Sequence, residues 1–338
     1  MPDEAALEEL LSRPTPALVE AMGALDGDLL VLGAGGKMGP SLARLARRAW
    51  DEVVVRRRVI AVARFSEPGL SAALREHGVE TIPCDLFDRA QLAGLPEATN
   101  VVYMVGQKFG TTGEEARTWA INAYLPGAVA ERYPKARIVA FSTGNVYPLA
   151  AIESDGPVEA DPVGPIGEYA QSALARERVL EFFSRRNRTP MAILRLNYAV
   201  EPRYGVLRDI ADRVRAGEPL DSAMGKVNVI WQRDANAIAL RALAHCTAPL
   251  LVLNVTGRPA VSVRWVAEQF ARRWGVEPVF DGVEAPTALL SNPARMEALF
   301  GPPEVGVEEM ISRVAEWVEQ GGRSLGKPTH FSEREGRF

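Results

Sequence analysis

Short apolar runs recur along the chain and alternate with segments whose apolar residues lie three or four positions apart. Runs of four to six residues have the length of buried strands, and the segments between them have the period of amphipathic helices. The predicted strands are Leu29–Leu32, Val59–Ala63, Val79–Pro83, Val101–Val105, Arg137–Phe141 and Met191–Leu196. The predicted helices between them are 40–50, 69–77, 88–92, 114–132 and 165–186. This alternation predicts an α/β fold, a Rossmann-type doubly wound parallel sheet.

A glycine-rich turn follows the first predicted strand and opens the first helix of this alternation. Its sequence is GAGGKMG, with glycines at Gly33, Gly35, Gly36 and Gly39 and with Lys37 and Met38 between them. Glycines let the backbone approach a phosphate closely, and the N-terminus of a helix offers N–H groups and the positive end of its dipole. A strand, a glycine turn and a helix in this order predict a site for the pyrophosphate of a dinucleotide.

The alternation ends near residue 197, which suggests how the chain is divided. Further helices are predicted at 204–215, 234–245, 262–274, 293–300 and 307–319, and a last sheet strand at Leu250–Asn254. We expect an N-terminal helical extension (1–27, helices 3–12 and 16–24) against the outside of the sheet, a dinucleotide-binding domain (28–197, with returning segments near 227–256), a smaller, mostly helical substrate lobe (198–226 and 257–320) and a polar tail (321–338). The tail is either disordered or laid over a neighbouring surface.

The residues just after each strand are the candidates for ligand binding, because ligands of doubly wound sheets bind outside the carboxyl ends of the strands. Arg64 ends the second strand, where an acidic residue ordinarily holds the adenosine ribose. Arginine can instead pair with a 2′-phosphate, and Ser66 can add a hydroxyl. We therefore expect NADP as the cofactor and NAD as the second choice, with a solvated Arg64 as the alternative interpretation.

Composition excludes several other classes of function. The formal net charge is -4, so no basic surface indicates a nucleic-acid partner. The two cysteines, Cys84 and Cys246, cannot form a disulfide framework, and no Cys/His cluster indicates a metal. The acidic N-terminus lacks the pattern of a signal peptide, and no apolar run has the length of a membrane span. We expect a soluble, cytoplasmic protein without a membrane or metal partner.

Two stretches carry a resemblance to a known family: FSTGNVYP (141–148) and PVGPIGEYAQSALARERVLEFF (162–183). They resemble the extended short-chain dehydrogenase/reductases, in particular the NAD-dependent epimerase/dehydratase family. In that family a strand runs into a Ser/Thr-rich segment, and a later helix begins with Tyr-x-x-x-Lys. The resemblance implies that Thr143 and Tyr169 are catalytic. It also implies hydride transfer between a nicotinamide cofactor and a sugar-like substrate.

The resemblance extends over about residues 28–320 and assigns further candidates. In CDLFD, Asp85 and Leu86 correspond to the adenine side of the family's cofactor site. In WAINAYLPG, Asn122 corresponds to an asparagine that the family pattern has in a helix. Asn197 in LRLNYAVEP lies near the expected substrate. Together with the strand ends, this gives cofactor candidates Val105, Gly106 and Ser142 and substrate candidates Asn145, Asn197 and Tyr198.

One departure from the family pattern bears directly on activity. The family's lysine, four residues after the tyrosine, is Ala173 here. A free phenol has a pKa of about 10, and a neighbouring cation ordinarily lowers it. We hypothesise that Lys108, in VGQKFG after the fourth strand, reaches the substrate or Tyr169; a solvated loop lysine is the alternative.

Two classes of function remain open at this point. The first is an NAD(P)-dependent epimerase, dehydratase or reductase acting on a sugar or nucleotide-sugar-like molecule. The second is a catalytically degenerate NADP-binding sensor or scaffold. The resemblance also implies a homodimer through helices 114–132 and 166–186, with burial of these helices by the N-terminal extension as the competing possibility.

Overall fold

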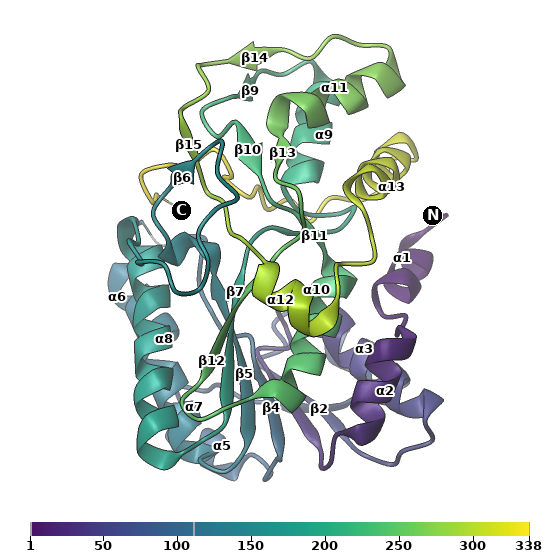
Figure 1. The fold of residues 1–338 in the computed structure, drawn as a ribbon. Coiled ribbons are helices and arrows are strands. Elements are labelled where there is room, and N and C mark those ends of the chain that lie inside the picture. The colour runs from purple at the N-terminus through teal and green to yellow at the C-terminus, as the bar shows by residue number, and fades with distance from the viewer. Residues whose placement is uncertain (1, 111, 338) are drawn as a thin grey trace.

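The computed structural model describes residues 2–110 and 112–337, and within them the main sheet has seven parallel strands. Their spatial order is β12-β7-β5-β4-β1-β2-β3 (Figure 1). The bounds are β1 Leu29–Leu32, β2 Val59–Ala63, β3 Glu80–Pro83, β4 Asn100–Tyr103, β5 Arg137–Thr143, β7 Met191–Leu196 and β12 Leu251–Val255. The predicted α/β fold class, a Rossmann-type parallel sheet, is confirmed.

Both faces of the sheet are covered by helices, which is why its strands read as continuous apolar runs. On one face, Leu29 and Val31 pack against α3 (Gly39–Glu52), α4 (Leu70–Glu76) and α10 (Gln232–Ala242). On the other face, Leu30 and Leu32 share a core with α5 (Arg89–Gly94), α7 (Leu125–Arg132) and α8 (Gly167–Asn187). The alternation along a strand sends successive side chains to opposite faces.

The N-terminal extension packs on helices of the first face. In α2 (Pro16–Ala24), Leu18 and Met22 join the core around α3, where the Trp50 indole N–H donates to the Met22 carbonyl at 2.8 Å. In α1 (Glu4–Leu11), Leu7 and Leu11 belong to the core of the second lobe. Helix α2 thus shares a core with Leu29 and Val31 of the sheet, whereas α1 packs on the second lobe. Neither helix buries 114–132 or 166–186, because those segments lie on the opposite face of the sheet (Figure 1), so this competing possibility is wrong.

The predicted helix 114–132 consists of three pieces: α6 (Glu115–Trp119), a π-helical turn at Ala120–Tyr124, and α7. Pro126 explains the interruption, because it has no N–H to donate to the carbonyl of Asn122 four residues earlier. The turn is wider there, and that carbonyl becomes available to another partner. π-Turns inside helices often mark functional sites.

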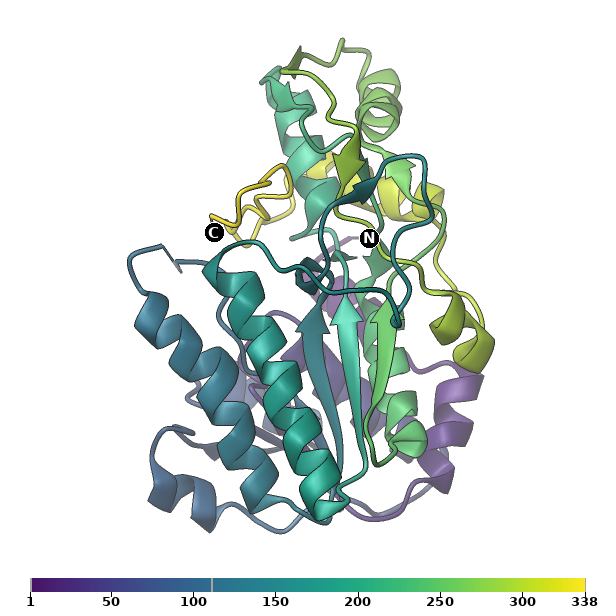
Figure 2. The same ribbon diagram turned by 60° about the vertical axis from the view of Figure 1, so that its left-hand side comes forward.

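The second lobe stands above the carboxyl edge of the sheet (Figure 2). Its core is formed by α9 (Val206–Ala216), α11 (Val263–Trp274) and α13 (Val307–Glu319), whereas Met296 and Phe300 of α12 (Ala294–Phe300) join the core of the sheet. The lobe was expected to be mostly helical, but strands of two residues also pair around it. These pairs are β6 (Ala150–Ala151) with β15 (Thr287–Ala288), β8 (Ala199–Val200) with β11 (Ile230–Trp231), β9 (Leu220–Asp221) with β14 (Phe280–Asp281), and β10 (Lys226–Val227) with β13 (Val261–Ser262).

The C-terminal tail runs across the boundary between the second lobe and the sheet domain. It leaves α13, and the Leu325 N–H donates to the Arg203 carbonyl at 3.0 Å. It then reaches the start of α8, where the backbone of Gly336 lies so close to Gly167 that a Cβ on either would collide (Figure 2). Of the two possibilities for the tail, the structure shows the second.

Candidate active site

Two glycines of the turn after β1 are required by close packing. Gly33 has φ +87°, and a Cβ there would lie 2.9 Å from the Val105 nitrogen. A Cβ on Gly39 would lie 2.6 Å from the Ala34 Cα, because α3 packs tightly against the turn. These positions let the strand, the turn and the helix meet.

Gly36 has more open space around it than Gly33 and Gly39, because a Cβ there would meet only the Gly33 oxygen, at 3.5 Å. Met38 occupies the N-cap of α3 and makes no side-chain capping hydrogen bond. The first N–H groups of a helix have no partner within the helix. An open glycine beside an uncapped helix N-terminus fits the pyrophosphate of a dinucleotide.

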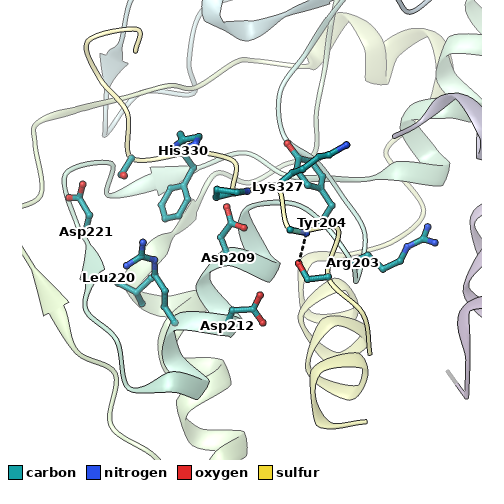
Figure 3. Close-up of a pocket in the computed structure, with 14 residues that line it drawn as sticks. Arg203, Tyr204, Asp209, Asp212, Leu220, Asp221, Lys327 and His330 are labelled. Atoms are coloured by element: carbon teal, nitrogen blue, oxygen red, sulfur yellow. Dashed lines mark hydrogen bonds between the residues drawn. The ribbon is translucent and has the colours of Figure 1, made fainter. Parts of the chain in front are cut away.

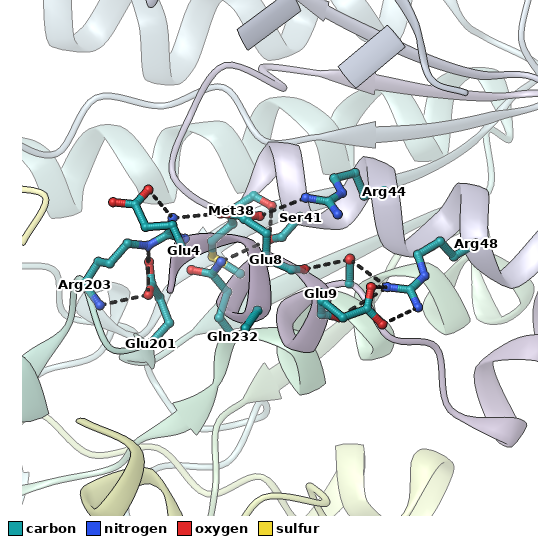
Figure 4. A network of polar contacts seen from close by, with 12 residues as sticks. Glu4, Glu8, Glu9, Met38, Ser41, Arg44, Arg48, Glu201, Arg203 and Gln232 are labelled. Carbon is teal, nitrogen blue, oxygen red and sulfur yellow. Dashed lines mark hydrogen bonds and ion pairs between the residues drawn. The ribbon is translucent and has the colours of Figure 1, made fainter. Parts of the chain in front are cut away.

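A cavity of about 400 Å³ adjoins this turn and includes Gly35, Gly36, Lys37 and Glu67 in its wall. Helix α1 closes one side through ion pairs (Figure 4). The Glu8 carboxylate lies 2.7 Å from Arg203 and 3.5 Å from Arg44, and Glu4 lies 2.7 Å from Arg323 in the tail. No local pattern in the sequence indicated that the two termini would meet beside the glycine turn.

The predicted residues on the adenosine side lie after β2 and β3. Arg64 and Ser66 are exposed on the loop that precedes Glu67. Asp85 is half-buried, and its Oδ1 accepts from the Phe87 N–H at 3.0 Å, while Leu86 is buried. The loop after β2 thus offers a cation and a hydroxyl to solvent next to the cavity.

A second cavity, of about 180 Å³, lies where β5, β7, α8 and the second lobe meet, and we call it the cleft. It collects predicted residues from distant parts of the chain. They are Lys37, Met38, Lys108, Ser142, Thr143, Asn145, Tyr169, Asn197 and Tyr198. Tyr204, Gln232 and Thr329 also line it and were not predicted.

Thr143 and Tyr169 are joined by a side-chain hydrogen bond. Thr143 ends β5, and Tyr169 lies in the first turn of α8. Burial raises the pKa of the Tyr169 phenol, while the hydrogen bond with Thr143 and the charge of Arg176 oppose that increase. The pair predicted from the sequence is therefore brought into contact inside the cleft.

Ala173 offers no cation one turn after Tyr169. It is fully buried and packs with Val146 and Tyr147. Arg176, a further turn along the same helix, is buried, and its guanidinium donates to the Phe141 carbonyl at 2.7 Å, the Asn122 carbonyl at 3.3 Å and the Asn122 Oδ1 at 2.7 Å. The sequence could have indicated Arg176, because residues seven positions apart lie on the same face of a helix.

All hydrogen-bonding positions of the Asn122 side chain are filled by protein groups. Its amide donates to the Gln107 carbonyl and the Ser172 hydroxyl, both at 2.9 Å, and its Oδ1 accepts from the Gln107 N–H and from Arg176. An asparagine side chain has two donors and two lone pairs. Asn122 was predicted to bind the cofactor, but it positions the loop after β4, which contains Val105 and Gly106, rather than offering a free polar atom to a ligand.

A buried ion pair lies beneath the catalytic candidates. The Glu177 Oε2 lies 2.7 Å from the Arg195 Nη2, and both side chains are at most 5% exposed. The Ser142 hydroxyl donates to Glu177 at 2.6 Å, and Arg195 donates to the Tyr147 hydroxyl at 2.7 Å. Ser142 lines the cleft, but its hydroxyl is held by Glu177.

The substrate candidates after β5 and β7 lie together. Asn145 and Asn197 are buried, and the Asn197 amide donates to the Leu289 carbonyl at 3.3 Å. Tyr198 has φ +44°, an uncommon conformation for a residue with a side chain, and burial raises its pKa. Such strain is often found at binding sites.

Two further observations bear on cofactors. Across residues 2–110 and 112–337, no group of three or more His, Cys, Asp and Glu side chains is placed to hold a metal ion. Over the same residues, no helix combines the length and the apolar character needed to cross a bilayer.

Comparison with known proteins agrees with this geometry. Residues 29–248 match the sequence model of the NAD dependent epimerase/dehydratase family. No curated protein matches the sequence.

Solved structures with the same fold include several complexes with NAD, among them the following three. UDP-glucuronic acid 4-epimerase from Bacillus cereus, in complex with NAD, is 17% identical with a TM-score of 0.71, over 87% of this chain and 99% of that one. DesIV, a dTDP-glucose 4,6-dehydratase from Streptomyces venezuelae with NAD and TYD bound, is 17% identical with a TM-score of 0.73, over 87% and 97%. WbmG from Bordetella bronchiseptica, in complex with NAD and UDP, is 20% identical with a TM-score of 0.71, over 90% and 99%.

Proposed function

The chain belongs to the NAD dependent epimerase/dehydratase family, and from that premise we propose that it is an oxidoreductase-type enzyme acting on a sugar-like substrate in the cleft. The reaction is a hydride transfer at a carbon that carries a hydroxyl or carbonyl group. The observation that carries this proposal is the hydrogen-bonded pair Thr143 and Tyr169, which lines one cavity with Met38 of the glycine turn.

The glycine turn is the proposed cofactor site. Gly35, Gly36 and the N–H groups at the start of α3 would hold the pyrophosphate, and Arg64 with Ser66 would hold a 2′-phosphate. We therefore propose NADP first and NAD second, although the solved structures of similar fold are described as complexes with NAD. A bound nicotinamide dinucleotide supplies the donor or acceptor of the hydride.

In the cleft, Thr143 donates a hydrogen bond to the reacting oxygen of the substrate and holds it beside the Tyr169 hydroxyl. In the oxidising direction the Tyr169 phenolate takes the hydroxyl proton as the hydride leaves the same carbon, which becomes a carbonyl carbon. In the reducing direction the Tyr169 phenol returns that proton. General acid–base catalysis by a positioned side chain contributes about 10²–10⁴-fold to the rate.

Arg176 is the cation that we propose in place of the family's lysine. Its charge lowers the pKa of Tyr169, and its guanidinium is held by three protein oxygens, so it acts as a positioning residue and does not touch the substrate. Lys108, which lines the cleft, is the proposed contact to the substrate.

The proposal is tested by incubating the purified protein with NADP or NAD and a panel of free and nucleotide-linked sugars. Nicotinamide absorbance reports net oxidation or reduction, and mass spectrometry and NMR of the products report epimerisation or dehydration without a net change. We expect conversion of at least one sugar, lowered by about 10²–10⁴-fold in Tyr169→Phe. Tight cofactor binding without any conversion would instead favour the sensor or scaffold.

A further inference from the structure

The C-terminal tail brings a polar side chain into the cleft. Thr329 lines the cleft together with Thr143 and Tyr169, and only 2% of its surface is exposed. Its neighbours Pro328 and His330 line the adjacent cavity instead. Of the tail residues up to 337, Thr329 is therefore the one that the tail contributes to the cleft.

The backbone beside Thr329 has an uncommon conformation. His330 has φ +51°, a region that residues with a side chain seldom adopt, and its imidazole is exposed. The residues on either side of it, Thr329 and Phe331, are both buried, and Phe331 belongs to the core of the second lobe. Strain of this kind persists where the surrounding contacts hold it, and it is often found at binding sites.

Asp209 of α9 holds the Thr329 side chain in one orientation. The Asp209 Oδ2 accepts from the Thr329 N–H at 2.7 Å and from the Thr329 hydroxyl at 2.5 Å. Figure 3 shows the tail passing Asp209 between Lys327 and His330. Burial raises the pKa of the Asp209 carboxyl, and the two hydrogen bonds from Thr329 oppose that increase. Because Asp209 lies in the wall of the adjacent cavity, the hydroxyl proton of Thr329 points out of the cleft.

Two anchors farther along the chain fix the tail on both lobes. Arg334 donates to two carbonyls of the second lobe, at 2.7 and 3.0 Å. The Gly336 backbone packs against Gly167 at the start of α8, two residues before Tyr169. The position of Thr329 is thus set relative to the second lobe and to the helix that carries Tyr169.

We propose that Thr329 is a substrate-binding residue of the cleft, that its hydroxyl oxygen accepts a hydrogen bond from a hydroxyl group of the sugar, and that Asp209 positions it. This inference rests on the proposed function and names a residue that determines its specificity. A hydroxyl group has one proton and two lone pairs, so the bond to Asp209 leaves the Thr329 oxygen able to accept. A sugar without the matching hydroxyl leaves that buried acceptor unpaired and is bound more weakly.

The experiment measures sugar binding by calorimetry in the full chain with NADP or NAD, carrying Tyr169→Phe so that turnover does not interfere. The probes are UDP-glucose, dTDP-glucose and D-glucose, with the 2-, 3-, 4- and 6-deoxy analogues of each. Thr329→Val should weaken binding of the parent sugar by about 3- to 10-fold, the equivalent of one hydrogen bond. One deoxy analogue should show a similar loss with Thr329 present and no further loss in Thr329→Val, because the two changes remove the same bond.

Conservative variants and a matched control separate binding from a general effect on the tail. Thr329→Ser keeps the hydroxyl and should keep both the affinity and the discrimination against that analogue. Asp209→Ala should weaken the discrimination, and Asp209→Asn, which keeps an acceptor oxygen, should restore most of it. Ser324→Ala removes an exposed hydroxyl of the tail outside the cleft and should leave the Kd unchanged.

Three outcomes would overturn the inference. Unchanged binding in Thr329→Val is the first, and an equal weakening of the parent sugar and all its deoxy analogues, which indicates a structural role for Thr329, is the second. Neither affects the proposed function, which depends on Tyr169-dependent conversion in the wider sugar panel. The third is no binding of any of the three parent sugars; conversion of another sugar of the panel would then keep the proposed function, and an unreactive panel would refute it too.

Discussion

At the residue scale, three residues on one face of α8 have different surroundings. Tyr169 enters the cleft, Ala173 is closed in by Val146 and Tyr147, and Arg176 brings a guanidinium to the carbonyl that Pro126 leaves available on Asn122. The Arg176 guanidinium, about one helical turn after Ala173, is held by backbone and amide oxygens. The pKa of Tyr169 is set by the balance between burial, which raises it, and the opposing contributions of Thr143 and Arg176.

The first prediction concerns the pH dependence of turnover. Arg176→Met removes the positive charge, so the pKa of Tyr169 rises further and less phenolate is present at a given pH. The rise of kcat with pH in the oxidising direction should therefore move to higher pH by about one unit or more. Arg176→Lys keeps the charge and should shift less. The measurement is kcat from pH 6 to 10, and a wild-type profile in Arg176→Met would contradict the role of Arg176.

The second prediction concerns stability. Glu177→Gln leaves Arg195 buried without its counter-charge, and removing one partner of a buried pair costs about 3–5 kcal/mol. Glu181→Gln is the matched control on the same helix, because its pair with Arg185 is largely exposed and contributes less than about 1 kcal/mol. Urea denaturation of both variants measures the difference, and equal losses would argue against a structural role for the Glu177–Arg195 pair.

At the scale of elements, the glycine turn and the interrupted helix place the site. The turn carries tight glycines that join β1 to α3 and an open one that lines the adjoining cavity. The π-turn at Ala120–Tyr124 directs Asn122 toward Gln107 and thereby positions the loop that carries Lys108. The glycine turn and the π-turn each form within a short stretch of sequence, but what each one positions depends on the element that it packs against.

The third prediction separates these two kinds of glycine. Gly36→Ala places a methyl group where the pyrophosphate is expected, so the cofactor Kd should rise by about 10-fold or more, with little change in Tm. Gly39→Ala places a methyl group against the Ala34 backbone and should cost about 1–3 kcal/mol of stability. Calorimetric titration and thermal unfolding measure the two effects. Unchanged cofactor affinity in Gly36→Ala would place the phosphates elsewhere.

At the scale of the whole molecule, α1 closes the cavity beside the glycine turn, while the tail and the second lobe enclose the cleft. Helix α1 pairs with Arg203 and with Arg323 of the tail, so the first and last segments are tied to each other and to the second lobe. On the opposite face, α6 and α8 remain uncovered by the extension (Figure 1). On this face the Phe182 side chain of α8 is 55% exposed, and Tyr124 in the π-helical turn is 47% exposed.

The fourth prediction tests the homodimer expected through helices 114–132 and 166–186. Phe182→Glu should convert a dimer into a monomer, because a charge cannot be buried there without a partner. Val283→Glu, on an 86% exposed residue of the second lobe, is the control and should keep the wild-type mass. Light scattering coupled to size-exclusion chromatography measures the mass, and a monomeric wild type would refute the dimer.

The sequence by itself determined the sheet, the glycine turn and the pair Thr143 and Tyr169. Buried strands require apolar runs, and a dinucleotide turn requires glycines, so both leave local patterns. The lobe's two-residue strands are too short to show a period, and Pro126 gave only an indirect sign of the π-turn. The predicted ends of helices and strands differ from the observed ends by a few residues, because capping and packing decide where an element ends.

Only the tertiary structure decided which side chains meet in the cleft. Lys37, Lys108 and the tail residue Thr329 line one cavity although they come from segments separated by tens to hundreds of residues, and no local pattern encodes such distances. Folding also decided that the four hydrogen-bonding positions of the Asn122 side chain are filled by protein groups. A sequence pattern records which chemistry a residue can perform, and the packing of distant elements decides what it faces.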